Sequence, residues 1–323
     1  EVSPGTRDRV LGILEELEYE PDILASSLAS RRPFRIAVLL PFHTPENWFW
    51  KEPLSGINDA CTELMHFRIE IIEYLYDQFS KKEFMEKTEE VLALAPDAVI
   101  AAPVFHQETK LFFNRCSSLG IPFVTINDNI NHPDQVSYVG QDPRRSGAVA
   151  AQLMKMSTIT GGHILVISIA RDKDNYNHIL YREEGFREYW ENNGKIARSE
   201  VINRTMPKDT YVYIKRALAE LFEKTEDIRG IFVTNSRVYQ VAKFLDNTGR
   251  KDIRLVGYDL IKPNVKYLNN DTIDFLISQK PREQGYKALM SVFNALKLNK
   301  KPSAEQLIPI DIICKENLCC YQV

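Results

Sequence analysis

Short apolar runs alternate with longer amphipathic runs along most of the chain, from about residue 35 onward. The apolar runs are rich in Val, Ile and aromatic residues and predict strands, whereas the longer runs have helical spacing. The predicted strands of a first series are "RIAVLLP" (35–41), "FRIEIIEYLY" (67–76), "DAVIAAP" (97–103) and "PFVTIND" (122–128), and those of a second are "HILVISIA" (163–170), "IARSEVI" (196–202), "GIFVTN" (230–235) and "IRLVGYD" (253–259).

Most of these strands are apolar along nearly their whole length, and a helix pattern follows most of them. That arrangement is typical of parallel sheets covered by helices on both faces. Two such series predict an α/β protein with two doubly wound parallel sheets. A chain of 323 residues is long enough to bury a core in each.

The first 33 residues do not follow this pattern. "SPGTRDRVLGILEELEYEPD" (3–22) predicts an amphipathic helix that ends before Pro21, because Ser3 can cap it and Pro4 suits its first turn. "DILASSLASRRPF" (22–34) predicts a second, short helix. Its small side chains bury little apolar area, so it is marginal alone.

Composition narrows the protein class. The formal net charge is −3, from 41 basic and 44 acidic residues, so any contact with nucleic acid has to be local. Five cysteines without zinc spacing favour a reducing compartment. No apolar run is long enough for a membrane helix, and no apolar segment of a signal peptide is visible. We therefore expect a cytoplasmic protein with no membrane partner.

No residue pattern predicts an enzyme. We find no P-loop, no G-x-S-x-G turn and no G-x-G-x-x-G loop, and we expect no cofactor. The six histidines are scattered and none has the i, i+4 spacing of a zinc site, so no metal site is predicted. They are His43, His66, His106, His132, His163 and His178.

The segment "NWFW" (47–50) holds two of the three tryptophans, in a connection between a predicted strand and the helix-like run "PLSGINDACTELM" (53–65). Connections normally run over the surface. Rings of this size therefore have to be covered by the core, by a partner or by a ligand.

Several ordered segments together resemble bacterial transcription regulators of the lac-repressor family, which have a type I periplasmic-binding-protein core. The resemblance covers essentially the whole chain. The family has a helix-turn-helix ahead of "VSPGTR", so we expect a regulator that lacks most of this module. The segments are "VSPGTRDRVLGILEELEYEPDILASSLAS" (2–30), "RIAVLLP" to "GI" (35–57), "VGQDPRRSG" (139–147), "YREEGF" (181–186), "FVTNSRV" (232–238), "LVGYDL" (255–260) and "ISQKPREQG" (277–285).

The resemblance implies two interleaved lobes with the effector between them, a homodimer formed along these lobes, and operator DNA as a partner. It also implies that the short helix orders as a hinge on DNA, with Leu28 and Ala29 at the minor groove, where an apolar wedge can kink the duplex. Packing of Leu28 on the core is the alternative. The implied domains are 1–33, 34–140 plus 280–307, and 141–279 plus 308–323.

The same resemblance implies where the effector binds. "NWFW" stands where sugar-binding relatives have Asn-Pro-Phe-Phe, so Asn47 would hydrogen-bond the ligand, and Phe49 and Trp50 would offer it ring faces. A sugar has apolar C–H faces and a polar rim, which suits such a wall. The alternative is that these rings only plug the end of the lobe, and Trp48 in particular is expected to pack or to lie at the rim.

Polar residues at strand ends and on the next helical turn complete the implied site. Sugar-binding relatives often have Asp-Arg where this chain has Asn127 and Asp128, so the fork of donors of that arginine is missing here. Each of these polar side chains could instead be an ordinary cap or a surface charge. The implied effector residues at these positions are Asn127, Asp128, Arg182, Asn235, Asp259 and Gln279.

We therefore expect a ligand-responsive bacterial transcriptional regulator, a repressor, that binds a small sugar or sugar derivative. A periplasmic-type solute-binding or sensor protein is the alternative, since it shares the two-lobed core. Residues 2–33 favour the regulator, because a periplasmic protein has no need of them. An enzyme on this scaffold would lack any reactive constellation.

Overall fold

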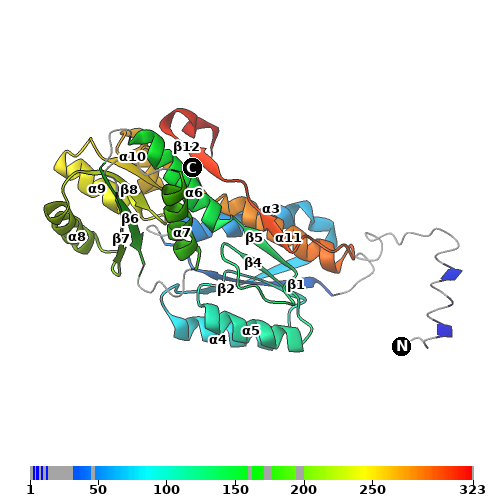
Figure 1. Cartoon of the computed structure of the whole chain (residues 1–323). Coiled ribbons are helices and arrows are strands. Elements are labelled where there is room, and N and C mark those ends of the chain that lie inside the picture. The colour runs from blue at the N-terminus through cyan, green and yellow to red at the C-terminus, as the bar shows by residue number, and fades with distance from the viewer. Residues whose placement is uncertain are drawn as a thin grey trace.

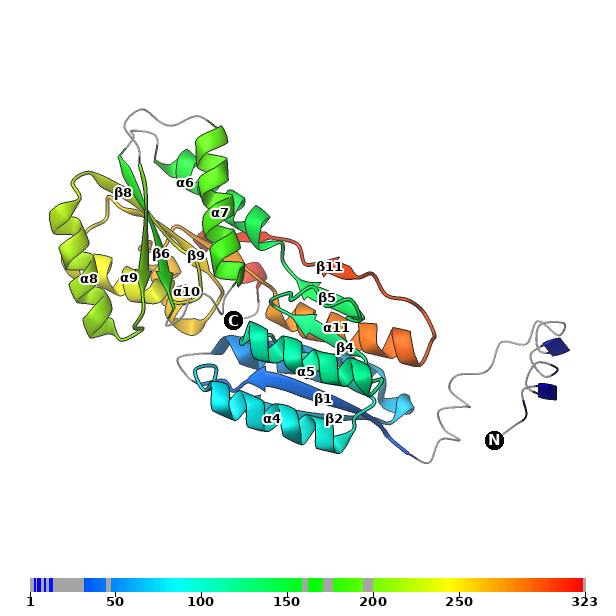
Figure 2. The ribbon, with the colours of Figure 1, turned by 60° about the horizontal axis from the view of Figure 1, so that its bottom comes forward.

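The computed structural model describes residues 32–44, 48–158, 162–170, 177–193 and 200–321, with a few positions nearer the N-terminus. It shows two α/β lobes, each with a six-stranded sheet between layers of helices (Figures 1 and 2). The predicted fold class, with two doubly wound and mostly parallel sheets, is confirmed.

The predicted N-terminal helices lie largely outside the described residues, and so do the predicted hinge residues Leu28 and Ala29. Within the part of the chain that the structure describes, no helix combines the length and the apolarity needed to cross a bilayer. The helical residues described near the N-terminus are Gly5, Thr6, Arg9, Gly12 and Ile13.

The N-terminal lobe is built on a parallel sheet of order β11-β5-β4-β3-β1-β2. Helices α3 and α11 cover one face and α4 and α5 the other (Figure 1), which explains why β1 is buried along nearly its whole length. The elements are β1 (Phe34–Pro41), η1 (Trp48–Trp50), α3 (Lys51–Glu63), η2 (Met65–Phe67), β2 (Ile69–Tyr76), α4 (Lys81–Leu94), β3 (Ala98–Ala101), α5 (His106–Ser118), β4 (Phe123–Ile126), β5 (Ser137–Gly140), α11 (Pro281–Leu296) and β11 (Glu305–Leu307).

The C-terminal lobe has the sheet order β12-β10-β9-β8-β6-β7, in which only β12 is antiparallel to its neighbour. Alternate residues of β6 face the two cores: Ile164 and Val166 pack towards α6 and α7, Leu165 and Ile167 towards α8 and α9. The elements are α6 (Pro143–Ser157), β6 (His163–Ile169), α7 (Asn177–Asn192), β7 (Val201–Met206), α8 (Tyr211–Lys224), β8 (Ile228–Val233), α9 (Val238–Thr248), β9 (Arg254–Tyr258), α10 (Lys262–Asn269), β10 (Phe275–Ser278), β12 (Asp311–Ile313) and η4 (Lys315–Cys320).

The chain crosses between the two sheets three times: after β5, after β10 and after β11. Gln141, in the first crossing, donates from its amide to the carbonyl oxygens of Ser278 (2.8 Å) and Pro309 (3.0 Å) in the other two. The side chain is buried. One glutamine therefore ties all three crossings together.

The predicted strand over 196–202 is wrong in its bounds. The strand β7 runs over Val201–Met206, so the apolar residues at 201 and 202 begin the strand instead of ending it. β7 is an edge strand, and its exposed residues Arg204 and Thr205 do not follow the apolar pattern used to predict strands. The short strands β5, β10, β11 and β12 were also missing from the strands predicted by pattern.

Candidate ligand-binding site

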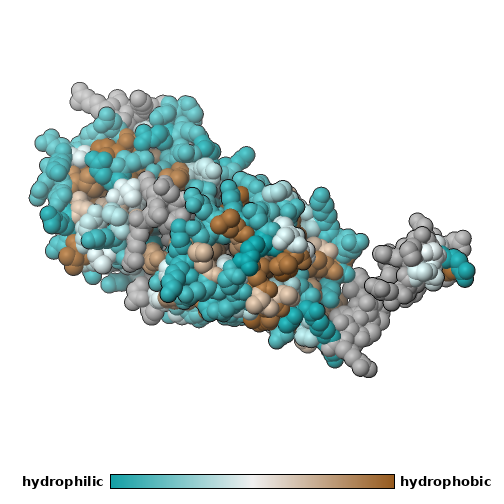
Figure 3. Space-filling model, turned by 90° about the horizontal axis from the view of Figure 1, so that it is seen from below, coloured by the Kyte–Doolittle hydropathy of each residue, from teal (hydrophilic) through white to brown (hydrophobic). Residues whose placement is uncertain are grey.

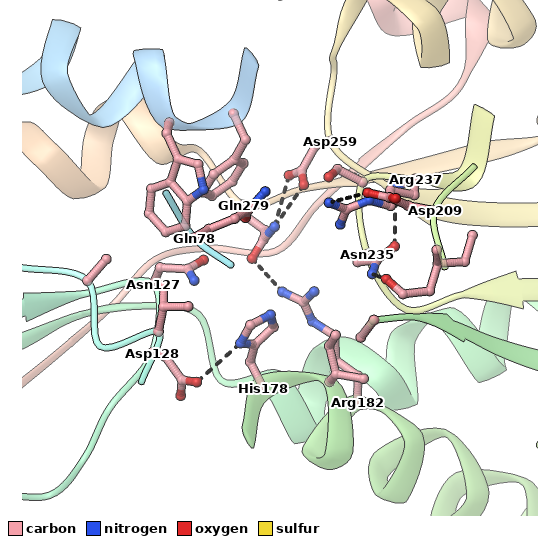
Figure 4. A pocket seen from close by; sticks show the side chains of 18 of the residues that line it. Gln78, Asn127, Asp128, His178, Arg182, Asp209, Asn235, Arg237, Asp259 and Gln279 are labelled. Atoms are coloured by element: carbon pink, nitrogen blue, oxygen red, sulfur yellow. Dashed lines mark hydrogen bonds and ion pairs between the residues drawn. The ribbon is translucent and has the colours of Figure 1, made fainter. Parts of the chain in front are cut away.

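A cleft lies between the two lobes, at the carboxyl ends of the parallel strands. This is where ligands of open α/β sheets bind, because loops and helix starts converge there. Its empty volume is about 780 Å³, including the solvent at its mouth. Both lobes supply its lining residues (Figure 4), which are Phe49, Trp50, Gln78, Phe79, Ala102, Pro103, Val104, Asn127, Asp128, Ile169, Ala170, His178, Ile179, Arg182, Asp209, Asn235, Ser236, Arg237, Asp259 and Gln279.

Residues proposed from the sequence as effector ligands are brought together in this cleft. Asn47 lies outside the described residues, and Trp48 lines a different hollow. Whether the lining residues hold a ligand stays a prediction. The proposed residues that line the cleft are Phe49, Trp50, Asn127, Asp128, Arg182, Asn235, Asp259 and Gln279.

One wall of the cleft is aromatic. Phe49 and Trp50 form the end of η1, and their ring centroids lie 5.0 Å apart in an edge-to-face arrangement. Each ring is at most 7% exposed and is also part of the core of the N-terminal lobe. The core alternative and the ligand alternative for "NWFW" therefore do not exclude one another, because one side of each ring can pack while another lines the cleft.

Trp48 has a different place. Lys51 of its own lobe lies 4.1 Å from its ring centroid, and Lys262 of the other lobe lies 5.5 Å away. Cations at these distances are attracted by the negative face of the indole. Trp48 is thus a contact between the lobes outside the cleft, which agrees with its expected position at the rim.

The polar floor of the cleft is a chain of hydrogen bonds that joins Arg182 to Asp259 through Gln279 (Figure 4). Arg182 donates to the Gln279 side-chain oxygen and, at 2.8 Å, to the Thr234 carbonyl oxygen. The Gln279 amide donates to both carboxyl oxygens of Asp259, at 3.1 and 2.9 Å. The guanidinium carbon of Arg182 also lies 3.8 Å from the ring centroid of Tyr258. Arg182 is therefore fixed in place without a ligand.

Asp259 combines burial with a strained backbone. Its φ is +69°, in the left-handed region that non-glycine residues rarely adopt. Burial raises the pKa of its carboxyl to about 6, and Arg182 and Gln279 oppose that rise only in part. Such a carboxylate is short of stabilising donors. Hydroxyl groups of a ligand are donors of the kind that it lacks.

A second polar group joins the lobes at Asp128. One carboxyl oxygen accepts from His106 Nε2 (3.0 Å) of the same lobe and from His178 Nδ1 (3.2 Å) of the other. Burial alone would raise the pKa of Asp128, but these two hydrogen bonds outweigh it and hold the pKa well below its usual value. Burial lowers the pKa of His178, and Asp128 opposes this only in part. The group is thus a buried carboxylate that accepts a hydrogen bond from one imidazole of each lobe.

Asn235 has its polar atoms engaged by the protein. Its amide donates to the Ile169 carbonyl oxygen at 2.8 Å, and its oxygen accepts from the Arg237 backbone N–H at 3.2 Å. The Arg237 guanidinium nitrogen Nη2 lies 3.5 Å from the Asp209 carboxyl oxygen Oδ2. The alternative of a local cap, left open by the sequence, therefore describes much of what Asn235 does here.

Sequence reasoning missed some of the polar lining residues. His178 lies one helical turn before Arg182 on α7, and Arg237 follows Asn235 by two residues, so proximity in sequence could have indicated both. His106, which lies just outside the cleft, gave no such signal, because it meets Asn177 only through the packing of the lobes. Among the described residues, no three His, Cys, Asp or Glu side chains are placed to hold a metal ion.

A family profile described as "periplasmic binding protein domain" matches residues 36–301, which is most of the chain. The chain belongs to this family. Its matching region contains both sheets except β12 and β11, and all the cleft-lining residues. The cleft therefore lies wholly within the part of the chain that matches the family.

Relatives with described roles include regulators. The chain is 24% identical over 311 residues to catabolite control protein A of Priestia megaterium, covering 87% of this chain and 89% of that protein. It is 23% identical over 314 residues to the catabolite repressor/activator of Escherichia coli strain K12, covering 93% and 85%.

Solved structures show the same fold in two kinds of protein. A proposed LacI transcriptional regulator from Bacteroides fragilis superposes with a TM-score of 0.84 at 28% identity, over 90% of this chain and all of that one. GanP, a glucose-galactose binding protein from Geobacillus stearothermophilus, has a TM-score of 0.77 at 21% identity, over 89% of this chain and 99% of that one. The second likeness concerns the fold alone.

Proposed function

We propose that the protein is a ligand-responsive bacterial transcriptional regulator whose cleft binds a small, uncharged sugar. The observation that carries the sugar proposal is the pairing of an aromatic wall with a buried polar floor inside one cleft. Trp50 and Phe49 supply the ring faces from one lobe, while Arg182 and Asp259 supply polar groups from the other. A sugar ring presents matching apolar faces and hydroxyl edges.

The charges in the cleft favour an uncharged ligand. Three carboxylates line it, Asp128, Asp209 and Asp259, against the two guanidinium groups of Arg182 and Arg237. Both arginines already have acceptor partners. A phosphate near one of these carboxylates would be repelled by roughly 3 kcal/mol at about 5 Å, with an effective dielectric constant of about 20. Hydroxyl groups carry no such penalty.

The regulator role rests on the relatives and on the N-terminal segment. Proteins described as a catabolite control protein and a catabolite repressor/activator match most of this chain. We propose that residues 1–33 belong to a DNA-binding module and its hinge, and that the lobes are 34–140 plus 280–307 and 141–279 plus 308–323. Ligand would then bias the relative orientation of the lobes, and with it the operator affinity, as a coupling free energy.

A homodimer in the cytoplasm completes the proposal. Apolar patches are visible on the face that Figure 3 shows, and both lobes expose large apolar side chains that a second copy could cover. Sedimentation equilibrium should give twice the mass of one chain, and a monomer at tens of micromolar would contradict the dimer. The most exposed such side chains include Met65, Leu111, Leu119, Met156 and Val212.

Thermal unfolding with matched pairs of sugars and their phosphate esters tests the ligand class. A compound that binds only the folded protein raises the midpoint. We expect a neutral sugar to raise it and its phosphate ester to bind at least tenfold more weakly. A stronger effect of the ester would contradict an uncharged ligand, and no effect of any sugar would contradict the sugar proposal itself.

Two variants with a matched control test the wall and the floor. Trp50→Ala and Asp259→Ala should each weaken binding about tenfold or more, since each removes ~1–3 kcal/mol of contact. Trp48→Ala removes a ring that contacts the other lobe but does not line the cleft, so it should weaken binding less than Trp50→Ala. Equal effects of Trp48→Ala and Trp50→Ala would mean that the rings act only as packing.

The rival role of solute-binding protein makes a different prediction for the native protein in its cell. Immunoprecipitation from cross-linked cells should enrich specific DNA sites, and the enrichment should change when the sugar is supplied. Recovery of the protein from an exported fraction, with no DNA enriched, would favour the solute-binding role.

A further inference from the structure

Four side chains, two from each lobe, are linked by three hydrogen bonds, two of which cross the lobe boundary. Asp128 follows β4 and His106 begins α5, both in the N-terminal lobe, while Asn177 and His178 begin α7 in the C-terminal lobe. The Asn177 amide lies 2.8 Å from His106 Nδ1. The two imidazoles both contact Asp128, at 3.0 and 3.2 Å.

The chemistry of these groups fixes the direction of each hydrogen bond. An ionised carboxylate only accepts, so His106 Nε2 and His178 Nδ1 must both carry a proton. An amide nitrogen only donates, so His106 Nδ1 must accept from Asn177. His106 therefore satisfies both neighbours only as the neutral imidazole with its proton on Nε2. In this arrangement every one of the three hydrogen bonds has a donor and an acceptor.

We propose that His106, Asp128, Asn177 and His178 are a closure latch, positioning residues that hold the two lobes in the closed orientation. The side chains of Asp128, His106 and His178 are only 8%, 12% and 14% exposed. Opening the cleft would break both hydrogen bonds that the latch makes across the lobe boundary and leave an ionised carboxylate short of a donor.

The latch is connected directly to the ligand site. His178 and Arg182 lie one turn apart on α7, so a shift of this helix moves the latch and the cleft floor together. Asp128 and His178 line the cleft, whereas His106 and Asn177 do not. The two outer members can therefore be changed without removing a side chain that faces the ligand.

The buried imidazole of His178 makes the latch sensitive to acid. The titratable and charged groups that face His178 are Asp128 and His106 across the boundary and Arg182 on its own helix. Burial, Arg182 and His106 disfavour the protonated form, and Asp128 favours it. Protonation of His178 should therefore favour the open orientation, in which its imidazole regains water.

The test compares Asn177→Ala and His106→Ala with His132→Ala in the whole protein. His132 Nε2 lies 3.0 Å from the Asn114 side-chain oxygen, so His132→Ala breaks a histidine–asparagine hydrogen bond inside one lobe. Small-angle scattering without sugar measures the lobe opening, and titration measures the affinity for the neutral sugar found by thermal unfolding. Only the affinity measurement depends on the proposed sugar site; the scattering measurement does not.

We expect both latch variants to raise the radius of gyration without ligand and to weaken sugar affinity about 3–10-fold, the effect of one lost hydrogen bond. The double variant should cost less than the sum, because both variants break one contact. His132→Ala should do neither. Lowering the pH from 7.5 to 5.5 should open the original protein more than the Asn177→Ala variant.

Unchanged scattering curves for both latch variants would overturn the latch, whatever the sugar affinity shows. An equal opening by His132→Ala would also overturn it, because the effect would then be a general loss of stability. Failure of every sugar to bind, with the latch variants still opening, would leave the latch standing and refute the sugar site alone.

Discussion

A methyl group added at Gly185 should force α7 away from α6. The two helices cross so closely that a Cβ at Gly185 would lie 2.7 Å from the carbonyl carbon of Arg144, and closer still to its oxygen. Ordinary contacts of this kind are 3.4–4 Å long. The helices must therefore separate by roughly 1 Å, because backbone atoms cannot rotate away as a side chain can.

Two opposing effects decide the magnitude. Alanine in a helix interior is favoured over glycine by up to ~1 kcal/mol, and overpacking of a tight contact costs about 1–3 kcal/mol. At Gly185 the cost of overpacking should exceed the gain in helix propensity, because the added methyl group clashes with backbone atoms of the facing helix. Gly147 on α6 faces the carbonyl of Arg182 in the same way. Either alanine therefore also displaces the backbone that holds the arginine of the cleft floor.

Thermal unfolding and sugar titration measure the two consequences. Gly185→Ala and Gly147→Ala should each lower the midpoint by about 2–8 °C and weaken sugar binding severalfold. The double variant should be less than additive, because the first methyl already separates the helices. Gly12→Ala is the control, as nothing lies within 4 Å of its added Cβ. A midpoint unchanged or raised by both Gly185→Ala and Gly147→Ala would refute the reasoning.

Three further predictions follow from burial and charge. The pKa of Asp259 is raised to about 6, above an unfolded value near 3.9, so stability present below about pH 4 is lost as the pH rises through 6. Asp259→Asn should therefore stabilise the ligand-free protein by about 1–3 kcal/mol at pH 8 and little at pH 4, measured by urea unfolding, and an equal effect at both pH values would contradict this. Burial raises the pKa of Cys116 to about 12, so a thiol reagent should spare it in the native protein while it labels the exposed Cys319 and Cys320; rapid labelling of Cys116 would contradict its burial. Removal of the lysine beside Trp48 in Lys262→Ala should shift the tryptophan emission spectrum, whereas Lys266→Ala on the same helix should not, and identical spectra for all three proteins would contradict the cation–π contact.

Much of the fold was predictable because parallel strands buried on both faces leave a strong signal. β1, β3 and β6 are apolar at nearly every position, and the pattern found them. The apolar pattern is missing from strands that are exposed or very short. β7 lies at a sheet edge with exposed polar residues, and β11 and β12 have only three residues each, too few to show a period.

Site residues that directly follow a strand could be predicted from the sequence. Contacts that depend on how the two lobes are oriented could not. Asp259 follows β9 directly, and Asn127 follows β4, so each reaches the cleft whatever the other lobe does. The contact of His106 with Asn177 depends on the angle between two lobes that fold separately around their own cores. No local pattern in the sequence encodes that angle.

The resemblance motifs also had a meaning that the sequence did not reveal. Gly147 is the last residue of "VGQDPRRSG", and Gly185 lies within "YREEGF". The close contact between α6 and α7 is made at these two glycines. Part of each motif is thus packing and not ligand contact. Arg182, in the second motif, serves both purposes, since its carbonyl faces Gly147 and its guanidinium group lies in the cleft.

The N-terminal lobe also contains a pair of helices in close backbone contact, and this explains how ligand binding could act on the crossings between the lobes. A Cβ at Gly56 on α3 would lie 2.7 Å from the carbonyl carbon of Arg282 on α11, so α3 and α11 are joined as α7 and α6 are. α11 begins just after the second crossing and α6 just after the first. η1, with Trp50, leads into α3, and Arg182 lies on α7. A ligand that draws these two residues together therefore pulls on helix pairs that move as units. The change in shape has to fall on the crossings that Gln141 ties together.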